Sequence, residues 1–247
     1  MLTQQTLKEK FIEIGVQAGM YLEVHSSLRS FDEVQGGADA VINALQEIIT
    51  PAGAIIMPSF PLSRPYTLSE EELQLGLTYK VKVLDPDSNE RTGMGIIADT
   101  FRHRPDVKTG PGRFRVSAWG AEQEKNCQGF SNLHEHDGYA LLLGVDIYRL
   151  TSMHYVEADL PQAVRDYVKP DPEVQANYAE DEWYVQSRQL PVEGWYTIQE
   201  QAYQQGLIHD LQIGQAKCMF LKVNPVIELY RDALRKDGFG LFGLSPQ

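Results

Sequence analysis

A strand–helix–strand pattern near the N-terminus limits the possible folds more than any other feature. Residues 21–24 form a short run typical of a strand, and residues 54–57 form a second, wholly apolar one. Between them, residues 38–49 predict a helix whose inward face carries Val41, Ile42, Leu45, Ile48 and Ile49. Strand, helix and strand in this order predict a parallel β-α-β unit with a right-handed crossover, and hence an α/β protein.

The rest of the chain adds elements of both kinds. Helices are expected at 3–18, 96–104, 121–127, 197–205 and 225–236, and strands at 116–120, 141–145, 183–187, 207–214 and 216–221. There is no internal repeat and no clear linker, so we expect a single domain over residues 1–247. Its architecture should be a central mixed, largely parallel sheet flanked by helices. Residues 62–91 break the pattern, and a connection this long predicts an insertion that shapes a substrate cleft.

Charge and composition narrow the partners. The 247 residues include 22 Lys and Arg against 34 Asp and Glu, for a net charge of −12. This balance argues against nucleic acid and is compatible with a cationic substrate. The polar N-terminus does not resemble a signal peptide, and no apolar run reaches the roughly 20 residues that cross a bilayer. Two cysteines, Cys127 and Cys218, are too few for a disulfide framework, so we expect a cytoplasmic protein with reduced thiols.

One histidine stands out as a candidate base. The apolar run 141–145 predicts a buried strand, and Thr151 and Ser152 after it are residues that begin helices. His154 and Glu157 then lie three apart, on one face of that predicted helix. A carboxylate there can hold one imidazole nitrogen and leave the other free to take a proton. The alternative is an ordinary surface histidine in a local pair with an acid.

Two other groups of residues are candidates for a metal site or for a nucleophile. His134, His136 and Asp137 form a short pattern found in metal-dependent hydrolases, but Gly138 follows where such sites need further ligands. Metal-dependent hydrolysis therefore remains an alternative from another class. Cys127 and Cys218 are interpreted as buried free thiols rather than nucleophiles.

A set of short motifs, in order along most of the chain, carries a family resemblance. They are Val24-His25-Ser26-Ser27-Leu28 with Gly36-Gly37, Ile56-Met57-Pro58-Ser59-Phe60, Thr92-Gly93-Met94-Gly95 through Phe101-Arg102 and Pro105, Val116-Ser117-Ala118-Trp119-Gly120, Asp137-Gly138 with Leu141–Val145, and Thr151–Glu157. Each motif is weak alone, whereas the ordered set is fairly specific. The chain resembles the aminoglycoside N3-acetyltransferases, antibiotic-resistance enzymes whose fold is unrelated to that of the GNAT acetyltransferases.

The resemblance implies an enzyme that transfers acetyl from acetyl-CoA to an amine of a small molecule, an aminoglycoside or amino sugar. It implies no metal. It implies that CoA lies against His25, Ser26, Ser27, Leu28, Arg29 and Ser30. It places the catalytic residues at Thr151, His154 and Glu157. With an imidazole as general base, we expect direct transfer in a ternary complex, with no acyl-enzyme.

One segment departs from the family pattern. Many relatives carry His-Pro and His-Ser pairs before the strand that matches 116–119, but residues 110–115 contain no histidine, and Asp99 stands where Glu is usual. The acceptor could therefore be an aminoglycoside or a non-antibiotic biosynthetic amine. The oligomeric state is left open.

Overall fold

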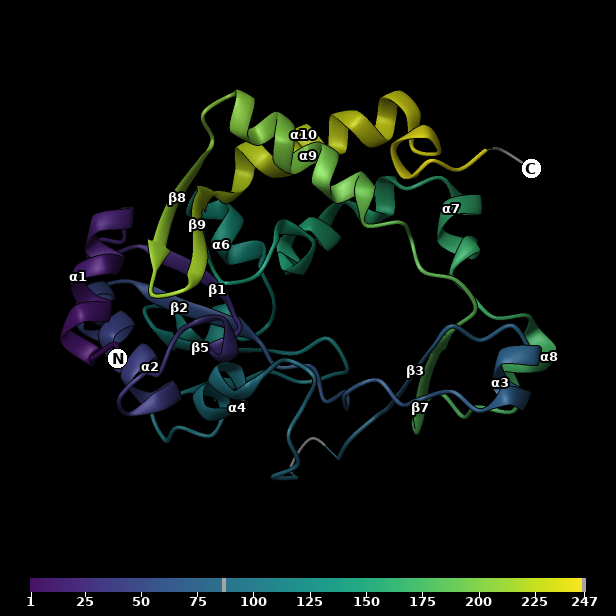
Figure 1. Ribbon diagram of the computed structural model, residues 1–247, viewed down its shortest axis with the longest axis horizontal. Helices are drawn as coiled ribbons and strands as arrows, with labels where there is room; N and C mark the ends of the chain where they lie inside the picture. Colours follow the sequence, from purple (N-terminus) through teal and green to yellow (C-terminus); the bar gives the residue numbers. More distant parts are fainter. Residues whose placement is uncertain (86–87, 246–247) are drawn as a thin grey trace.

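The computed structural model describes residues 1–85 and 88–245, without the side chains of 157–159. Seven strands in this part of the chain form one mixed sheet in the order β4-β5-β2-β1-β6-β9-β8. They are β1 (Tyr21–Ser26), β2 (Ala54–Pro58), β4 (Lys108–Thr109), β5 (Val116–Gly120), β6 (Tyr139–Leu143), β8 (Ile208–Ile213) and β9 (Ala216–Lys222). The expected mixed α/β architecture is confirmed (Figure 1).

Parallel pairing is confined to the centre of the sheet. β1 lies parallel to both β2 and β6. The strand–helix–strand pattern of the sequence predicted the first of these pairings, that of β1 with β2. The outer strands all pair antiparallel: β5 with β2 and β4, and β9 with β6 and β8. The sheet is therefore less parallel than the sequence suggested. The parallel centre matters most here, since its three strands end at the same edge.

Helices cover both faces of the sheet, and the strand residues alternate between them. One core lies under α1 (Gln4–Ile14), α2 (Gly37–Ile49) and α4 (Ile96–Arg102), against Ile55, Leu141 and Phe220 among others. The other lies under α9 (Glu193–Gln204) and α10 (Val223–Asp237), against Ile56, Leu142 and Met219. The remaining short elements of the main body are η1 (Leu28–Ser30), α5 (Gln123–Asn126), α6 (Ser131–Glu135), η2 (Ile147–Arg149), α7 (Gln162–Tyr167) and η4 (Gly240–Phe242).

Some boundaries differ from the sequence expectation for identifiable reasons. Helix α1 ends at Ile14, four residues before the predicted end at 18, because the backbone at Gly15 turns to a φ of 123°. A Cβ at this position would lie 2.9 Å from the Phe220 ring, so glycine also allows the close contact. The segment expected as an α-helix after residue 150 is the 3₁₀ helix η3 (Thr151–Asp159).

The two irregular stretches of the sequence come together as a second small sheet. β3 (Tyr79–Lys82), from the expected insertion, pairs antiparallel with β7 (Trp183–Gln186). The helices α3 (Glu70–Gln74) and α8 (Pro172–Gln175) flank it, and Figure 1 shows this part standing away from the main sheet. Glu72 caps α3, forms an ion pair with Lys80 and accepts a hydrogen bond from Tyr178 at 3.2 Å. The acidic run at 70–72 is thus partly used to hold these two stretches together.

Among the described residues, every helix is too short or too polar to cross a bilayer.

Candidate active site

A cavity of about 930 Å³ opens where the parallel strands end. Its walls come from the end of β1 and the residues after it (24–29), the end of β2 and the residues after it (58–64), residues 144–154 after β6, and the start of α4 with the residues before it (91–98). The carboxyl edge of a parallel sheet is the usual place for a site in an α/β protein, because loops from several strands converge there. The cavity therefore brings residues 25–29 of the predicted CoA segment together with Thr151 and His154 of the predicted catalytic segment.

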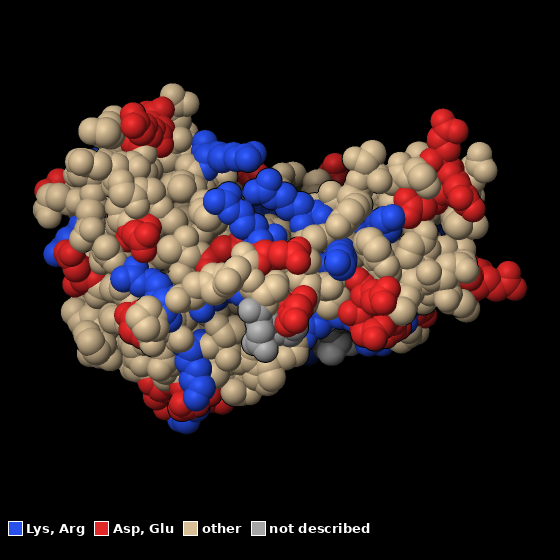
Figure 2. Space-filling view, turned by 90° about the horizontal axis from the view of Figure 1, so that it is seen from below, with Lys and Arg blue, Asp and Glu red and all other residues tan. Residues whose placement is uncertain are grey.

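Positive charge dominates the cavity wall. The cavity is lined by Arg29, Arg64, Arg91 and Arg149. Among the described residues, its lining contains one acidic side chain, that of Asp146. Within the same described part of the chain, none of the four arginines forms an ion pair with a carboxylate. Figure 2 shows Lys and Arg side chains gathered in the middle of one face, between the main body and the part built on β3 and β7. In a chain of net charge −12, such a concentration favours a polyanionic ligand.

Arg149 also faces the small sheet. Burial raises the pKa of the Tyr79 phenol, and the positive charge of Arg149 opposes part of that shift. Tyr79 lies on β3, so the small sheet approaches the cavity at this arginine. The Arg149 guanidinium itself lies 4.8 Å from the centre of the Tyr148 ring.

A buried acidic side chain lies behind the cavity wall formed by His25 and Thr151. Glu23 lies in the middle of β1 and is fully buried. Its Oε1 lies 2.6 Å from His25 Nε2 and accepts a hydrogen bond from the Ser152 amide at 3.1 Å, while the Ser152 hydroxyl donates to Oε2. The Thr151 amide donates to His25 Nε2 at 3.2 Å. These contacts join β1 to the start of η3, which satisfies a polar group that burial would otherwise penalise.

The predicted base lies beside this network. Thr151 and His154 both line the cavity, and His154 is exposed to solvent. The 3₁₀ geometry stacks positions three apart directly above each other, so the backbone places residues 154 and 157 one turn apart. The side chain of Glu157 lies outside the described residues, so its contact with His154 stays a prediction.

The predicted CoA segment divides into two parts. Residues His25 to Arg29 line the cavity. Ser30 instead lies behind the wall, where its hydroxyl donates to the Gly144 carbonyl at 2.9 Å. Gly144 has a φ of 68°, and a Cβ there would lie 2.3 Å from the Ser30 Cβ, so only glycine allows this approach between the ends of β1 and β6.

Asp99, the departure noted in α4, organises another wall. It accepts hydrogen bonds from the Thr92 amide and the Thr92 hydroxyl, both at 3.0 Å, and from Arg102 Nε at 3.1 Å. These bonds fix the turn before Gly93 and Gly95, which line the cavity. The shorter Asp side chain therefore serves as a local anchor at this position.

The segment without histidines, 110–115, approaches the cavity from the β2 side. Arg115 Nε donates to the Ser59 carbonyl at 2.9 Å, and Arg113 donates to the Glu180 carbonyl. Phe114 is 63% exposed and lies edge-on to Phe60, a cavity residue, with ring centres 5.3 Å apart. Arginine and phenylalanine side chains thus occupy this approach.

The alternative metal site is not formed. His134 Nδ1 lies 2.8 Å from Asn224 Oδ1, whereas His136 stacks on Tyr21 and Asp137 pairs with Lys222. Across the residues that the structure describes, no group of three His, Cys, Asp or Glu side chains could hold a metal ion. The hydrolase interpretation of these three residues is therefore wrong.

The two cysteines are buried free thiols, as the sequence indicated. Burial raises the pKa of the Cys218 thiol to about 12, which keeps it protonated and unreactive near neutral pH. Cys127 donates to the Glu124 carbonyl and does not line the cavity described above.

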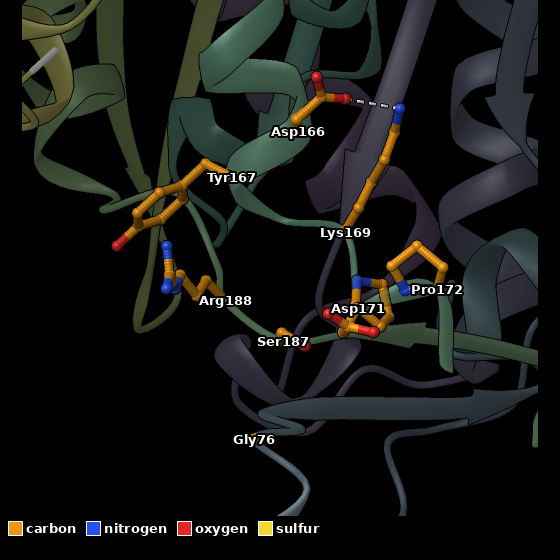
Figure 3. Close-up of a pocket in the computed structure, with 9 residues that line it drawn as sticks. Gly76, Asp166, Tyr167, Lys169, Asp171, Pro172, Ser187 and Arg188 are labelled. Carbon is orange, nitrogen blue, oxygen red and sulfur yellow. Dashed lines mark hydrogen bonds and ion pairs between the residues drawn. The ribbon is translucent and has the colours of Figure 1, made fainter. Parts of the chain in front are cut away.

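A second cavity, of about 570 Å³, lies between α7 and the small sheet (Figure 3). Its charged groups are already engaged, since Lys169 pairs with Asp166 at 2.8 Å and Arg188 lies 4.9 Å from the centre of the Tyr167 ring. Its described lining contains no histidine or cysteine. The arginine-lined cavity is therefore the better candidate for chemistry.

Sequence comparison identifies the family of this α/β protein with a basic cavity. The sequence profile of the aminoglycoside 3-N-acetyltransferase family matches residues 24–235. The chain belongs to this family, which confirms the resemblance seen in the ordered motifs.

Two curated relatives illustrate the relation. The SPbeta prophage-derived aminoglycoside N(3')-acetyltransferase-like protein YokD of Bacillus subtilis (strain 168) is 31% identical over 179 residues, or 64% of this chain and 66% of that protein. Aminoglycoside N(3)-acetyltransferase IV of Salmonella sp is 29% identical over 170 residues, or 63% of this chain and 59% of that protein. The matches thus span less than two thirds of either relative.

Solved structures confirm the fold. The apoenzyme of aminoglycoside acetyltransferase AAC(3)-IVa superposes with a TM-score of 0.73 at 23% identity, covering 99% of this chain and 92% of that one. A complex of AAC-IIIb with CoASH superposes with a TM-score of 0.68 at 16% identity, covering 99% of each chain.

Proposed function

We propose that this protein transfers an acetyl group from acetyl-CoA to an amine of an aminoglycoside or amino sugar, directly and with His154 as general base. The observation that carries the proposal is the arginine-lined cavity, which holds both the segment 25–29 and His154 on its wall. Family membership supports the reaction class, and the relative AAC-IIIb has been solved with CoASH.

The charge of the cavity suits the donor. CoA carries several phosphate charges, and arginine is the side chain best matched to phosphate oxygens. Arg29, Arg64, Arg91 and Arg149 would hold those phosphates, and their freedom from carboxylate partners within the described residues leaves their donors available. Acetyl-CoA supplies the acetyl group as an activated thioester.

His154 would accept the proton that the amine loses as it attacks the thioester carbonyl. An imidazole is basic enough for this role near neutral pH, and a positioned general base contributes about 10²–10⁴ in rate. Glu157, one turn further along η3, would hold the ring in the correct orientation, and Thr151 would border the reacting groups. The exposure of His154 leaves room for an acceptor beside it.

The charge that develops on the carbonyl oxygen needs hydrogen-bond donors. The first two amides of η3 are poor candidates, because Thr151 N–H and Ser152 N–H already donate to His25 and Glu23. The hydroxyls of Ser26 and Ser27, on the cavity wall, are the better choice. We further propose that the insertion at 62–91 shapes the acceptor side, since Arg64 and Arg91 at its two ends line the cavity.

The test is thiol release from acetyl-CoA with a panel of acceptors that includes 2-deoxystreptamine drugs and simple amino sugars. We expect amine-dependent release by the wild type, and a loss of about 10²-fold or more in kcat for His154→Ala with CoA binding retained. His209→Ala, an equally exposed histidine on the edge strand β8, is the matched control. Full turnover by His154→Ala would reject the base assignment, and activity limited to non-drug amines would identify a biosynthetic acceptor.

A further inference from the structure

We propose that His25 is a second catalytic residue, which donates a proton to the sulfur of CoA as the thioester bond breaks. The inference rests on the proposed acetyl transfer and concerns the other half of that reaction. His154 is assigned to the amine, and a separate donor at the sulfur would let the thiolate leave without waiting for the proton that His154 has taken. The geometry points to the pair formed by His25 and the buried Glu23.

The hydrogen bonds of His25 determine which ring nitrogen faces the cavity. Nε2 is held from two sides, by Glu23 Oε1 at 2.6 Å and by the Thr151 amide at 3.2 Å. His25 is only 7% exposed, yet it lines the cavity. Nδ1 is therefore the nitrogen left for a ligand.

The same contacts assign the protons. The Thr151 amide can donate to Nε2 only if Nε2 has a lone pair, so the proton of the neutral ring lies on Nδ1. We therefore assign Glu23 its carboxylic acid form, whose proton shares that lone pair with the Thr151 amide across the 2.6 Å contact between Oε1 and Nε2. In this arrangement, Nδ1–H is a donor directed to the cavity and a second proton stands behind it.

The transfer balances as a two-proton shift. The amine nitrogen forms its bond to the carbonyl carbon and loses a proton to His154. When the carbon–sulfur bond breaks, sulfur keeps the electron pair and takes the proton from His25 Nδ1. The proton shared with Glu23 moves to Nε2, which keeps the ring neutral. The resulting carboxylate stays bonded to the amide and hydroxyl of Ser152, and solvent protons restore the starting state.

The arrangement assigns separate roles to the two residues. His25 would touch the reacting sulfur and is the catalytic group. Glu23 acts through His25 and is a positioning residue that also supplies the second proton. The neighbouring positions on the same face, Ile56 and Ala140, are apolar, so His25 and Ser152 are the polar partners that the buried Glu23 has among the described residues.

The experiment compares two donors that differ only in the leaving atom: acetyl-CoA and its selenium analogue, acetyl-seleno-CoA. A selenolate is a much weaker base than a thiolate and departs without a proton. The variants are His25→Gln and Glu23→Gln. Glutamine at position 23 can still accept from the Ser152 hydroxyl and donate to Nε2, although it loses the bond from the Ser152 amide, and it has no proton to give to the ring. Ser117→Ala is the control, because among the described residues this buried hydroxyl on β5 bonds to Ser59 and Thr109, at 2.6 and 2.7 Å, and does not line the cavity.

We expect both variants to lose about 10²-fold or more in kcat with acetyl-CoA and less than about threefold with the selenium donor. Glu23→Gln should keep the KM for both donors, and Ser117→Ala should not distinguish them. Equal losses with both donors, or no loss with acetyl-CoA, would overturn the inference while leaving the proposed function intact. A wild type that consumes neither donor with any acceptor would remove the proposed function and this inference together.

Discussion

Removing the carboxyl group of Glu23 should destabilise the protein strongly. In Glu23→Ala, the amide and hydroxyl of Ser152 and the ring of His25 lose their shared partner in a fully buried place. An unsatisfied buried polar group costs about 1–3 kcal/mol, and a water molecule entering the vacated space would restore part of this. For three such groups we expect a loss of about 3–5 kcal/mol in the free energy of unfolding.

The assay is equilibrium unfolding in urea at pH 7, with the slope against denaturant compared between variants. Glu23→Gln keeps the shape and most of the hydrogen bonds, so it should lose much less than Glu23→Ala. Glu9→Ala, on the exposed side of α1, should stay within about 0.5 kcal/mol of the wild type. If Glu23→Ala also stayed within that limit, the network would not be holding η3 against β1, and the reasoning would be refuted.

Three further predictions test other parts of the site. Arg149→Ala should raise the KM for acetyl-CoA about tenfold or more, because a charge-assisted hydrogen bond contributes about 1.5–3 kcal/mol. An unchanged KM measured at low salt would exclude this arginine from binding of the acetyl donor. Gly144→Ala should lower the melting temperature more than Gly76→Ala. Both glycines have a positive φ, but a Cβ at position 144 would lie 2.3 Å from the Ser30 Cβ, whereas a Cβ at position 76 meets no described atom within 4 Å. Equal shifts in melting temperature would contradict the close approach. Cys218→Ala should reduce the loss of stability at alkaline pH. The pKa of this thiol is about 12 in the folded protein and 9.0 ordinarily, so the free energy of unfolding of the wild type falls by about 1.4 kcal/mol per pH unit between these values. Parallel curves of unfolding free energy against pH for the two proteins would contradict this.

Local sequence patterns predicted most of the scaffold because they report burial directly. The apolar runs at 54–57 and 141–143 became central strands, and the helix at 38–49 crosses between parallel neighbours. The pairing of β3 with β7 was not predictable in the same way. These strands lie about a hundred residues apart, and their pairing depends on contacts such as Lys80 with Glu72 and Trp183.

Site residues that belong to a sequence motif could be predicted, whereas those brought together only by tertiary contacts could not. His154 was singled out from its position after a predicted strand and His25 from the family resemblance, and both line one cavity. Glu23 was overlooked, although a charged residue within an apolar strand was the available signal. Arg64, Arg91 and Arg149 carry no pattern in the sequence, since only the convergence of three loops makes them neighbours.

The position of the CoA sulfur in a crystal of the protein grown with CoA tests the central claim most directly. The account predicts CoA in the arginine-lined cavity, with its sulfur between the rings of His25 and His154 and at about 3–4 Å from the nearer one. A CoA molecule bound elsewhere, or one whose sulfur points away from both rings, would contradict the account.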